Sequence, residues 1–245
     1  MTKIKGSYKT KAVLSTVKAV LVLLFVFLVG KGIFTDQRMT EVLGRDDIVH
    51  MVSRQGQELK EKKKVALTFD DGPHHVYTEI LLDGLLERDV QVTFFVTGEH
   101  AKLHPELIRR MYQEGHLVGN HTYSHMQLRT DNKQKYKEEL LLTNEILKEI
   151  SGEEVVFVRP PYGSWDKALE KELEMIPVLW TVDPLDWCSG SVREIVENTL
   201  PKVEEGSIIL LHDYFENSVE AALQIIDSLL EQGYCFVTVE ELLFA

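Results

Sequence analysis

Short apolar runs alternate with longer amphipathic stretches along the chain from residue 65 onward. The apolar runs have the length and the β-branched or aromatic composition of buried strands. They are Val65–Phe69, Val92–Val96, Val155–Val158, Val178–Val182, Ser207–Leu211 and Phe236–Val239. The intervening stretches have helical spacing and are Thr78–Leu86, Pro105–Glu114, Lys135–Ile150, Lys167–Glu174, Val192–Leu200 and Val219–Glu231. Such alternation predicts an α/β fold, a parallel sheet or barrel covered by helices.

The first 34 residues follow a different pattern. Four lysines precede an apolar stretch at Ala12–Phe34, of which Ala19–Gly30 is uninterrupted. The whole stretch can cross a bilayer, and no small-x-small cleavage site follows it. We therefore expect residues 1–34 to be an uncleaved membrane anchor, with a cleaved signal peptide as the alternative. The leading lysines favour a cytoplasmic N-terminus and a domain outside the cell membrane, or a secreted domain if the segment is cleaved.

Charge and composition separate the next segment from the domain. Residues 35–64 mix charges with few apolar positions, which predicts a stalk or linker before a catalytic domain at 65–245. Residues 1–64 hold 13 of the 27 Lys and Arg but only 6 of the 39 Asp and Glu, so the domain is strongly acidic. An acidic domain lacks the basic surface that nucleic-acid binding requires. The two cysteines, Cys188 and Cys235, exclude a disulfide scaffold, and their pairing stays open.

Polar residues follow several predicted strands directly. Val65–Phe69 leads into Asp70 and Asp71, and adjacent carboxylates repel each other unless a helix end or a cation stabilises them. His121 and His125, four residues apart, can bind one metal ion from a helical turn or a tight loop. Alone, each feature is equally consistent with turn chemistry or surface coincidence. Together, Asp71 and the two histidines leave coordination positions for water, which is typical of a catalytic metal site.

Three further strand ends carry polar residues of complementary types. They are Arg159-Pro160-Pro161-Tyr162-Gly163, Asp183-Pro184-Leu185-Asp186-Trp187 and His212-Asp213. Each taken singly is more simply structural, but the carboxyl ends of parallel strands meet at one edge of the sheet. At that edge the sequence therefore places a base, an acid, a cation and an aromatic side chain, which predicts an active site.

These motifs resemble those of the NodB-type polysaccharide deacetylases, also called carbohydrate esterase family 4. The five family motifs are matched in order by Thr68–Pro73, His121–His125, Arg159–Tyr162, Asp183–Trp187 and Leu210–His212. They span nearly the whole of residues 65–245 and none of the preceding segment. The resemblance implies a distorted (β/α) barrel with fewer than eight strands.

The resemblance also implies a metal site. Asp71, His121 and His125 would bind one divalent ion, zinc by expectation, with cobalt or another divalent ion as the alternative. Such an ion polarises an amide carbonyl and lowers the pKa of bound water. No other cofactor is expected.

The remaining motif residues acquire roles in the same way. Asp70 would be the general base, held by Arg159, and His212 the general acid, held by Asp186. Because a nearby carboxylate favours the imidazolium, Asp186 is expected to raise the pKa of His212. The backbone N–H of Tyr162 would donate to the oxyanion. The residues implied to contact the substrate are Trp187, Leu210 and Pro161.

The expected function is metal-dependent hydrolysis of the N-acetyl amide of N-acetylglucosamine-type residues in an extracytoplasmic polysaccharide, peptidoglycan if the source is a bacterium. One branch of the family, active on muramic residues, often has Asn in place of the second Asp of motif one. Asp71 therefore favours N-acetylglucosamine, with chitin oligomers and muramic residues as alternatives. The competing functions are a related amide or imide hydrolase and a non-catalytic carbohydrate-binding homologue. Apart from the polysaccharide and the membrane, the sequence indicates no partner.

Overall fold

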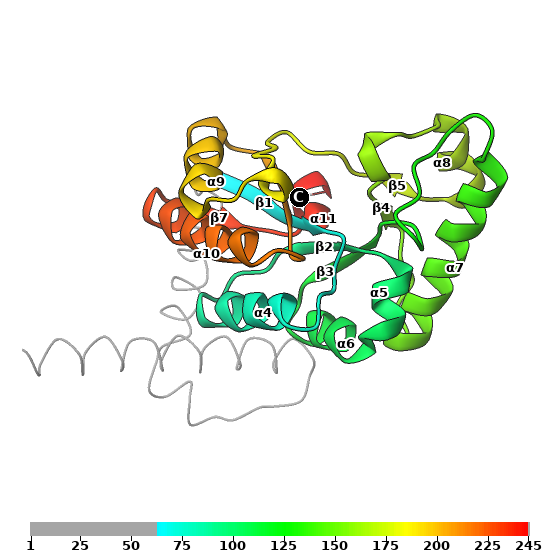
Figure 1. Cartoon of the computed structure of the whole chain (residues 1–245), viewed down its shortest axis with the longest axis horizontal. Helices are drawn as coiled ribbons and strands as arrows, with labels where there is room; N and C mark the ends of the chain where they lie inside the picture. Colours follow the sequence, from blue (N-terminus) through cyan, green and yellow to red (C-terminus); the bar gives the residue numbers. More distant parts are fainter. Residues whose placement is uncertain (1–62, 245) are drawn as a thin grey trace, which may run out of the picture. The chain divides into compact units, whose positions relative to one another are not determined.

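Strand β1 (Lys63–Asp70) lies in a parallel sheet, with partner strands on both sides, in the computed structural model, which describes residues 63–244 (Figure 1). It pairs with β2 (Thr93–Val96), β6 (Ile208–His212) and β7 (Tyr234–Phe236). The strand starts two residues before the apolar run that predicts it, because Lys63 and Lys64 pair with β7. At its other end, Asp70 is the register partner of His212. The carboxyl end of β1 therefore brings Asp70 of the first motif beside His212 of the fifth.

The sheet continues outward from β1 through β3 (Leu117–Asn120), β4 (Phe157–Val158) and β5 (Ile176–Pro177). Its order is β5-β4-β3-β2-β1-β6, and all its strand pairs are parallel. Beyond β5, Val182 forms a single parallel bridge with Ile209 of β6. The chain thus returns to the far edge of the sheet. A parallel α/β fold with seven strands among residues 63–244 confirms the predicted class.

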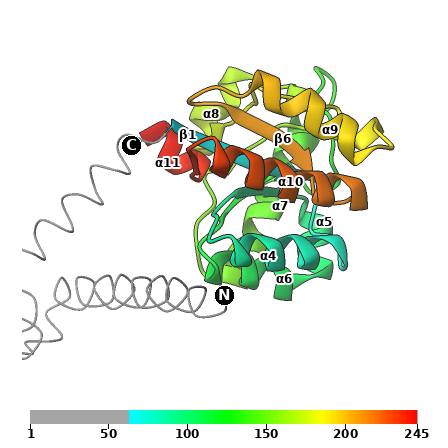
Figure 2. The ribbon, with the colours of Figure 1, turned by 90° about the vertical axis from the view of Figure 1, so that its left-hand side faces the viewer.

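Helices connect the strands and cover the sheet (Figures 1 and 2). They are α4 (Tyr77–Glu87), α5 (Gly98–Leu103), α6 (Pro105–Gln113), α7 (Lys133–Ser151), α8 (Lys167–Leu173), α9 (Val192–Thr199), α10 (Glu216–Glu231) and α11 (Val239–Phe244). Local signals set several ends: α8 and α9 begin where the side chains of Asp166 and Ser191 accept backbone N–H groups. Helix α7 ends at Gly152, whose φ of 80° suits glycine. Helix α10 packs against α9 and α4.

The core explains why β1 is continuously apolar. Val65, Leu67 and Phe69 pack into the main cluster with residues of α4, α6 and α10. Ala66 packs into a second cluster with Phe95. Because both faces of the strand are buried, no polar alternation is required along it.

The predicted strand at Val178–Val182 is the main departure from the sequence pattern. Only Ile176–Pro177 pairs as β5, and Val182 contributes just the bridge to β6. The backbone carbonyls of Val178 and Leu179 instead accept hydrogen bonds from the Arg159 side chain. The backbone of this segment therefore binds the buried guanidinium of Arg159 instead of pairing as a strand.

The predicted strand at Phe236–Val239 is also displaced. β7 ends at Phe236, and α11 starts at Val239. The Glu241 carboxylate accepts from the backbone N–H of Thr238, while the Thr238 hydroxyl accepts from the N–H of Glu241. This capping box starts the helix. Strand β3 and helix α5 are short and were not predicted.

The predictions of an anchor at residues 1–34 and a linker after it lie outside the described residues, apart from Lys63 and Lys64. None of the helices within residues 63–244 is both long and apolar enough to cross a bilayer. Cys188 is exposed, Cys235 is half-buried, and both are free thiols.

Candidate active site

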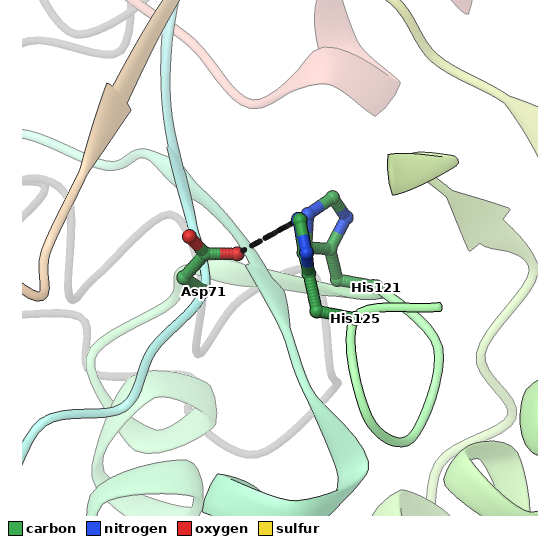
Figure 3. A group of neighbouring side chains, drawn as sticks. All are labelled: Asp71, His121 and His125. Atoms are coloured by element: carbon green, nitrogen blue, oxygen red, sulfur yellow. Dashed lines mark ion pairs between the residues drawn. The ribbon is translucent and has the colours of Figure 1, made fainter. Parts of the chain in front are cut away.

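Asp71, His121 and His125 meet at the carboxyl ends of β1 and β3. Asp71 directly follows β1, His121 follows β3, and His125 lies in the loop beyond it. Figure 3 shows the Asp71 carboxylate facing the two imidazole rings. Asp71 Oδ1 lies 3.4 Å from Nε2 of each histidine, and the three candidate ligand atoms all lie within 4.8 Å of one another. The sequence motifs are therefore brought together as one cluster.

The donor atoms of this cluster fit a divalent cation. Asp71 Oδ1 is buried and has no hydrogen-bond partner among residues 63–244. The Nδ1 of His121 lies 2.6 Å from the backbone carbonyl of Arg159, which can only accept, so Nδ1 donates and Nε2 is the candidate ligand atom. One carboxylate and two imidazoles aimed at a common point form a set that suits zinc and related ions.

The protonation states favour metal binding. Burial opposes the charge on Asp71, but the facing His121, His125 and His212 outweigh it and lower the pKa of Asp71 to about 2. Burial lowers the pKa of His125 despite the nearby Asp71 carboxylate. A metal ligand must be an ionised carboxylate or a neutral imidazole, and these shifts favour both forms at neutral pH.

Asp70 sits beside this cluster in a buried ion pair. Arg159, which has no exposed surface, donates from Nη1 to Asp70 Oδ1 at 2.8 Å and to the Thr68 hydroxyl at 2.6 Å. The guanidinium also lies over the ring of Phe95, with Cζ 4.2 Å from the ring centroid. The other oxygen, Asp70 Oδ2, lies 3.7 Å from His121 Nε2. One carboxylate oxygen is thus fixed and the other faces the candidate metal ligands.

His212 is held by Asp186. The backbone N–H of His212 donates to Asp186 Oδ2, and its Nδ1 donates to Asp186 Oδ1, both at 2.8 Å. Burial disfavours the imidazolium, but Asp186, followed by Asp70 and Asp71, outweighs it and raises the pKa of His212 to about 9. The site therefore combines a carboxyl whose pKa is lowered, Asp71, with an imidazole whose pKa is raised, His212.

A cleft of about 520 Å³ opens over these groups. It is lined by Asp70, Asp71, His121, His125, Pro160, Tyr162, Trp180, Asp183, Leu185, Trp187, Leu210, His212 and Phe215. Trp187 and Leu210, two of the residues predicted to contact the substrate, are among these lining residues. The third, Pro161, is not among them, whereas its neighbour Pro160 is. Tyr162 has a φ of 59°, a conformation that non-glycine residues rarely adopt.

Several residues around the site were not identified from the sequence. His100 of α5 lies with Nδ1 2.7 Å from the backbone carbonyl of Asp71. Phe215 lines the cleft although it stands outside the five motifs. Asn120 accepts from the backbone N–H of Thr122 inside the second motif. Of these, only Asn120 had a local signal, since Asn commonly bonds to the backbone two residues further on.

The parallel α/β scaffold brings together in one cleft a cluster that fits a divalent cation, a carboxylate fixed by Arg159 and an imidazole whose pKa is raised. Separate groups of this kind are typical of hydrolases that use one residue as acid and another as base. The polysaccharide deacetylase family model matches residues 57–178. The chain belongs to this family, as the NodB-type or carbohydrate esterase family 4 motifs predict. It is an enzyme of the polysaccharide N-deacetylase class.

Two curated relatives and one solved structure illustrate the similarity. The peptidoglycan-N-acetylglucosamine deacetylase of Bacillus cereus is 40% identical, over 72% of this chain and 67% of that protein. The peptidoglycan-N-acetylmuramic acid deacetylase PdaC of Bacillus subtilis is 39% identical over 74% of this chain, but the match spans only 39% of that protein. The solved structure of PdaC gives a TM-score of 0.71 at 38% identity, covering 74% of this chain and 90% of that one.

Proposed function

We propose that this chain hydrolyses the N-acetyl amide of N-acetylglucosamine residues in peptidoglycan, releasing acetate and leaving a free amine on the sugar. The observation that carries the proposal is the convergence of Asp71, His121 and His125 between two titratable groups held in different environments, Asp70 and His212. A module that only binds carbohydrate needs no such division of charge.

In the proposed reaction Asp70 is the general base. Its Oδ2 accepts a proton from the attacking water as the water oxygen bonds to the acetyl carbonyl carbon. The hydrogen bond from Arg159 to Oδ1 fixes the carboxylate so that Oδ2 faces the candidate metal ligands. The backbone N–H of Tyr162 donates to the oxyanion that develops on the carbonyl oxygen.

His212 completes the reaction as the general acid. An amine is a poor leaving group until its nitrogen is protonated, so the carbon–nitrogen bond breaks as the His212 imidazolium transfers its Nε2 proton to that nitrogen. Asp186 accepts the hydrogen bond from Nδ1 and thereby points Nε2 toward the cleft. The exposed ring of Trp187 and the side chain of Leu210 contact the acetylated sugar.

Asp71, His121 and His125 would hold the divalent ion, which we propose to be zinc. When bound, it would supply Lewis-acid polarisation of the acetyl carbonyl and a lower pKa for water at the site. The single carboxylate and two imidazoles leave room for both water and substrate oxygens.

The choice of peptidoglycan rests on the relatives. Two that match over about three-quarters of this chain act, by their names, on different peptidoglycan sugars. The retained Asp71 favours N-acetylglucosamine over N-acetylmuramic acid.

We further propose that residues 1–34 anchor the chain in the cell membrane with the domain outside, where this polymer lies. Protease added to intact cells freed of their wall should then digest the domain, whereas a mature N-terminus just beyond Gly30 would show secretion.

Acetate release tests the function directly. The purified full-length chain, loaded with zinc, should release acetate from N-acetylglucosamine oligomers and from purified peptidoglycan. Chelation should abolish release, and added zinc or cobalt should restore it. Mass spectrometry of the muropeptides then identifies which sugar has lost its acetyl group. Full activity in metal-free protein would contradict the metal site, and glycan binding without acetate release would indicate a non-catalytic homologue.

A further inference from the structure

The loop that carries both candidate histidine ligands has an unusual backbone. Between His121 and His125, and at His125 itself, the chain twice adopts a left-handed conformation at non-glycine residues: φ is 63° at Thr122 and 56° at His125. Such conformations cost of order 1–3 kcal/mol each and persist only where surrounding contacts enforce them. The separation of the two imidazoles therefore depends on what holds this loop.

Helix α7 holds the loop at two points. At the start of the loop, the buried Asn120 donates from Nδ2 to the Leu140 carbonyl and to Asn144 Oδ1, both on α7. In the middle of the loop, Glu139 of the same helix accepts two hydrogen bonds from Ser124. The backbone N–H of Ser124 donates to Oε2 at 3.0 Å, and its hydroxyl donates to Oε1 at 2.7 Å.

Glu139 differs from the other acidic residues of α7. Glu138, Glu145 and Glu149 are exposed, whereas Glu139 is only 9% exposed. None of the ion pairs found within residues 63–244 involves Glu139. A buried carboxylate without a cationic partner is unfavourable unless hydrogen bonds compensate for the lost water. Both of its oxygens bond to Ser124, so the burial of Glu139 is coupled to this one residue of the loop.

We propose that Glu139 is a positioning residue for the metal site: it fixes Ser124, and through it the backbone that sets the spacing of His121 and His125. This inference rests on the proposed function only in taking those histidines as metal ligands. Within residues 63–244 the Glu139 carboxylate accepts hydrogen bonds from Ser124 and from neither histidine, so it acts through the loop. When the carboxylate is removed, the loop can relax toward ordinary backbone angles. The Nε2 atoms of His121 and His125 are then no longer directed at one point.

The test is the metal affinity of the metal-free full-length chain, measured with zinc alone in competition with a chromophoric chelator. Groups that orient metal ligands typically contribute 10–100-fold to affinity, so Glu139→Ala should weaken zinc binding about tenfold. Glu139→Gln can keep both contacts, because its amide oxygen accepts from the Ser124 N–H and its NH2 group donates to the Ser124 hydroxyl oxygen, so it should bind zinc nearly as tightly as the parent. Glu138→Ala removes an exposed carboxylate from the same helix and should bind zinc as the parent does.

Parental zinc affinity in Glu139→Ala, or an equal loss in Glu138→Ala, would overturn the proposal. If Glu139→Ala does not fold, Ser124→Ala decides, because Ser124 is exposed and its hydroxyl supplies only one of the two bonds. That variant should bind zinc more weakly and change the visible spectrum of the cobalt form, and a parental affinity and spectrum would overturn the proposal. A parent that binds zinc but releases no acetate refutes the proposed reaction while leaving this test intact. A parent that binds no zinc refutes both.

Discussion

His212 and Asp186 are joined by two hydrogen bonds of 2.8 Å, one from the imidazole Nδ1 and one from the backbone N–H of His212. The backbone bond fixes the carboxylate relative to the strand, and the side-chain bond fixes the ring relative to the carboxylate. Nε2 is left facing the cleft, 4.0 Å from Asp71 Oδ2. Asp186 therefore both orients the imidazole of His212 and supplies the negative charge that raises its pKa.

Replacing Asp186 with Asn should remove the charge together with one of the two hydrogen bonds. The amide has nearly the shape of the carboxylate, but only its single oxygen accepts. Without the charge, the pKa of His212 should fall from about 9 toward its ordinary 6.5. A group that must be protonated then loses its proton at lower pH. The alkaline limb of the pH profile of kcat/KM should therefore shift to lower pH, while the acidic limb shifts much less. An alkaline limb that coincides with the parent's would rule out this coupling.

Removing the base or the acid should reduce turnover without releasing the metal. Asp70→Asn and His212→Ala should each lower kcat by roughly a hundredfold, as loss of general acid–base catalysis does. Neither residue belongs to the cluster of three candidate ligands, so bound zinc measured by elemental analysis should match the parent. If Asp70→Asn loses its zinc, the roles of the two adjacent aspartates are the reverse of those proposed.

Arg159 should be essential for stability as well as for orientation. The side chain is fully buried, and Arg159→Met leaves the Asp70 carboxylate buried without its partner. Breaking a buried ion pair from one side typically costs about 3–5 kcal/mol, which urea unfolding would detect. Adding Asp70→Asn to Arg159→Met removes the unpaired charge and should recover part of the loss. A double variant no more stable than the single one would show that Arg159 acts mainly through its other contacts.

Gly72 of the first motif should not tolerate a side chain. A Cβ there would lie 2.2 Å from Oδ2 of Asp213, a buried carboxyl that also accepts a hydrogen bond from Thr78. Gly72→Ala should therefore lower the free energy of unfolding by about 1–3 kcal/mol, the usual cost of overpacking. Gly190→Ala is the matched control, because a Cβ at Gly190 meets nothing within 4 Å. Equal stability of the two variants would contradict this reading of the packing.

The sequence was most informative where chemistry is local. Asp70 and Asp71 follow an apolar run without a break, and His121 and His125 stand four residues apart, so their types and spacing are visible before any fold is known. Their convergence could be predicted because parallel strands align their carboxyl ends. The helices with clear amphipathic spacing were predicted to within a few residues.

The supporting contacts were not visible because they join residues that are far apart in the chain. Nothing in the sequence around Glu139 shows that it will meet Ser124 rather than solvent. Likewise, the apolar run at Val178–Val182 has the composition of a strand, but two of its backbone carbonyls accept hydrogen bonds from Arg159, which directly follows β4. Helix α11 is different, since Thr238 and Glu241 have the spacing of a capping box, and the β-branched run before them masked that local signal.

The register that pairs Asp70 with His212 has a consequence for how the protein is made. A ribosome delivers β1 well before β6, so the nascent domain carries an apolar strand with one unpaired edge until β6 is made. Native pairing along that edge must wait for residues 208–212, and the same pairing event brings Asp70 and His212 together. Assembly of the cleft and burial of the aggregation-prone edge therefore coincide. A chain released before β6 would have an incomplete cleft and an exposed strand edge.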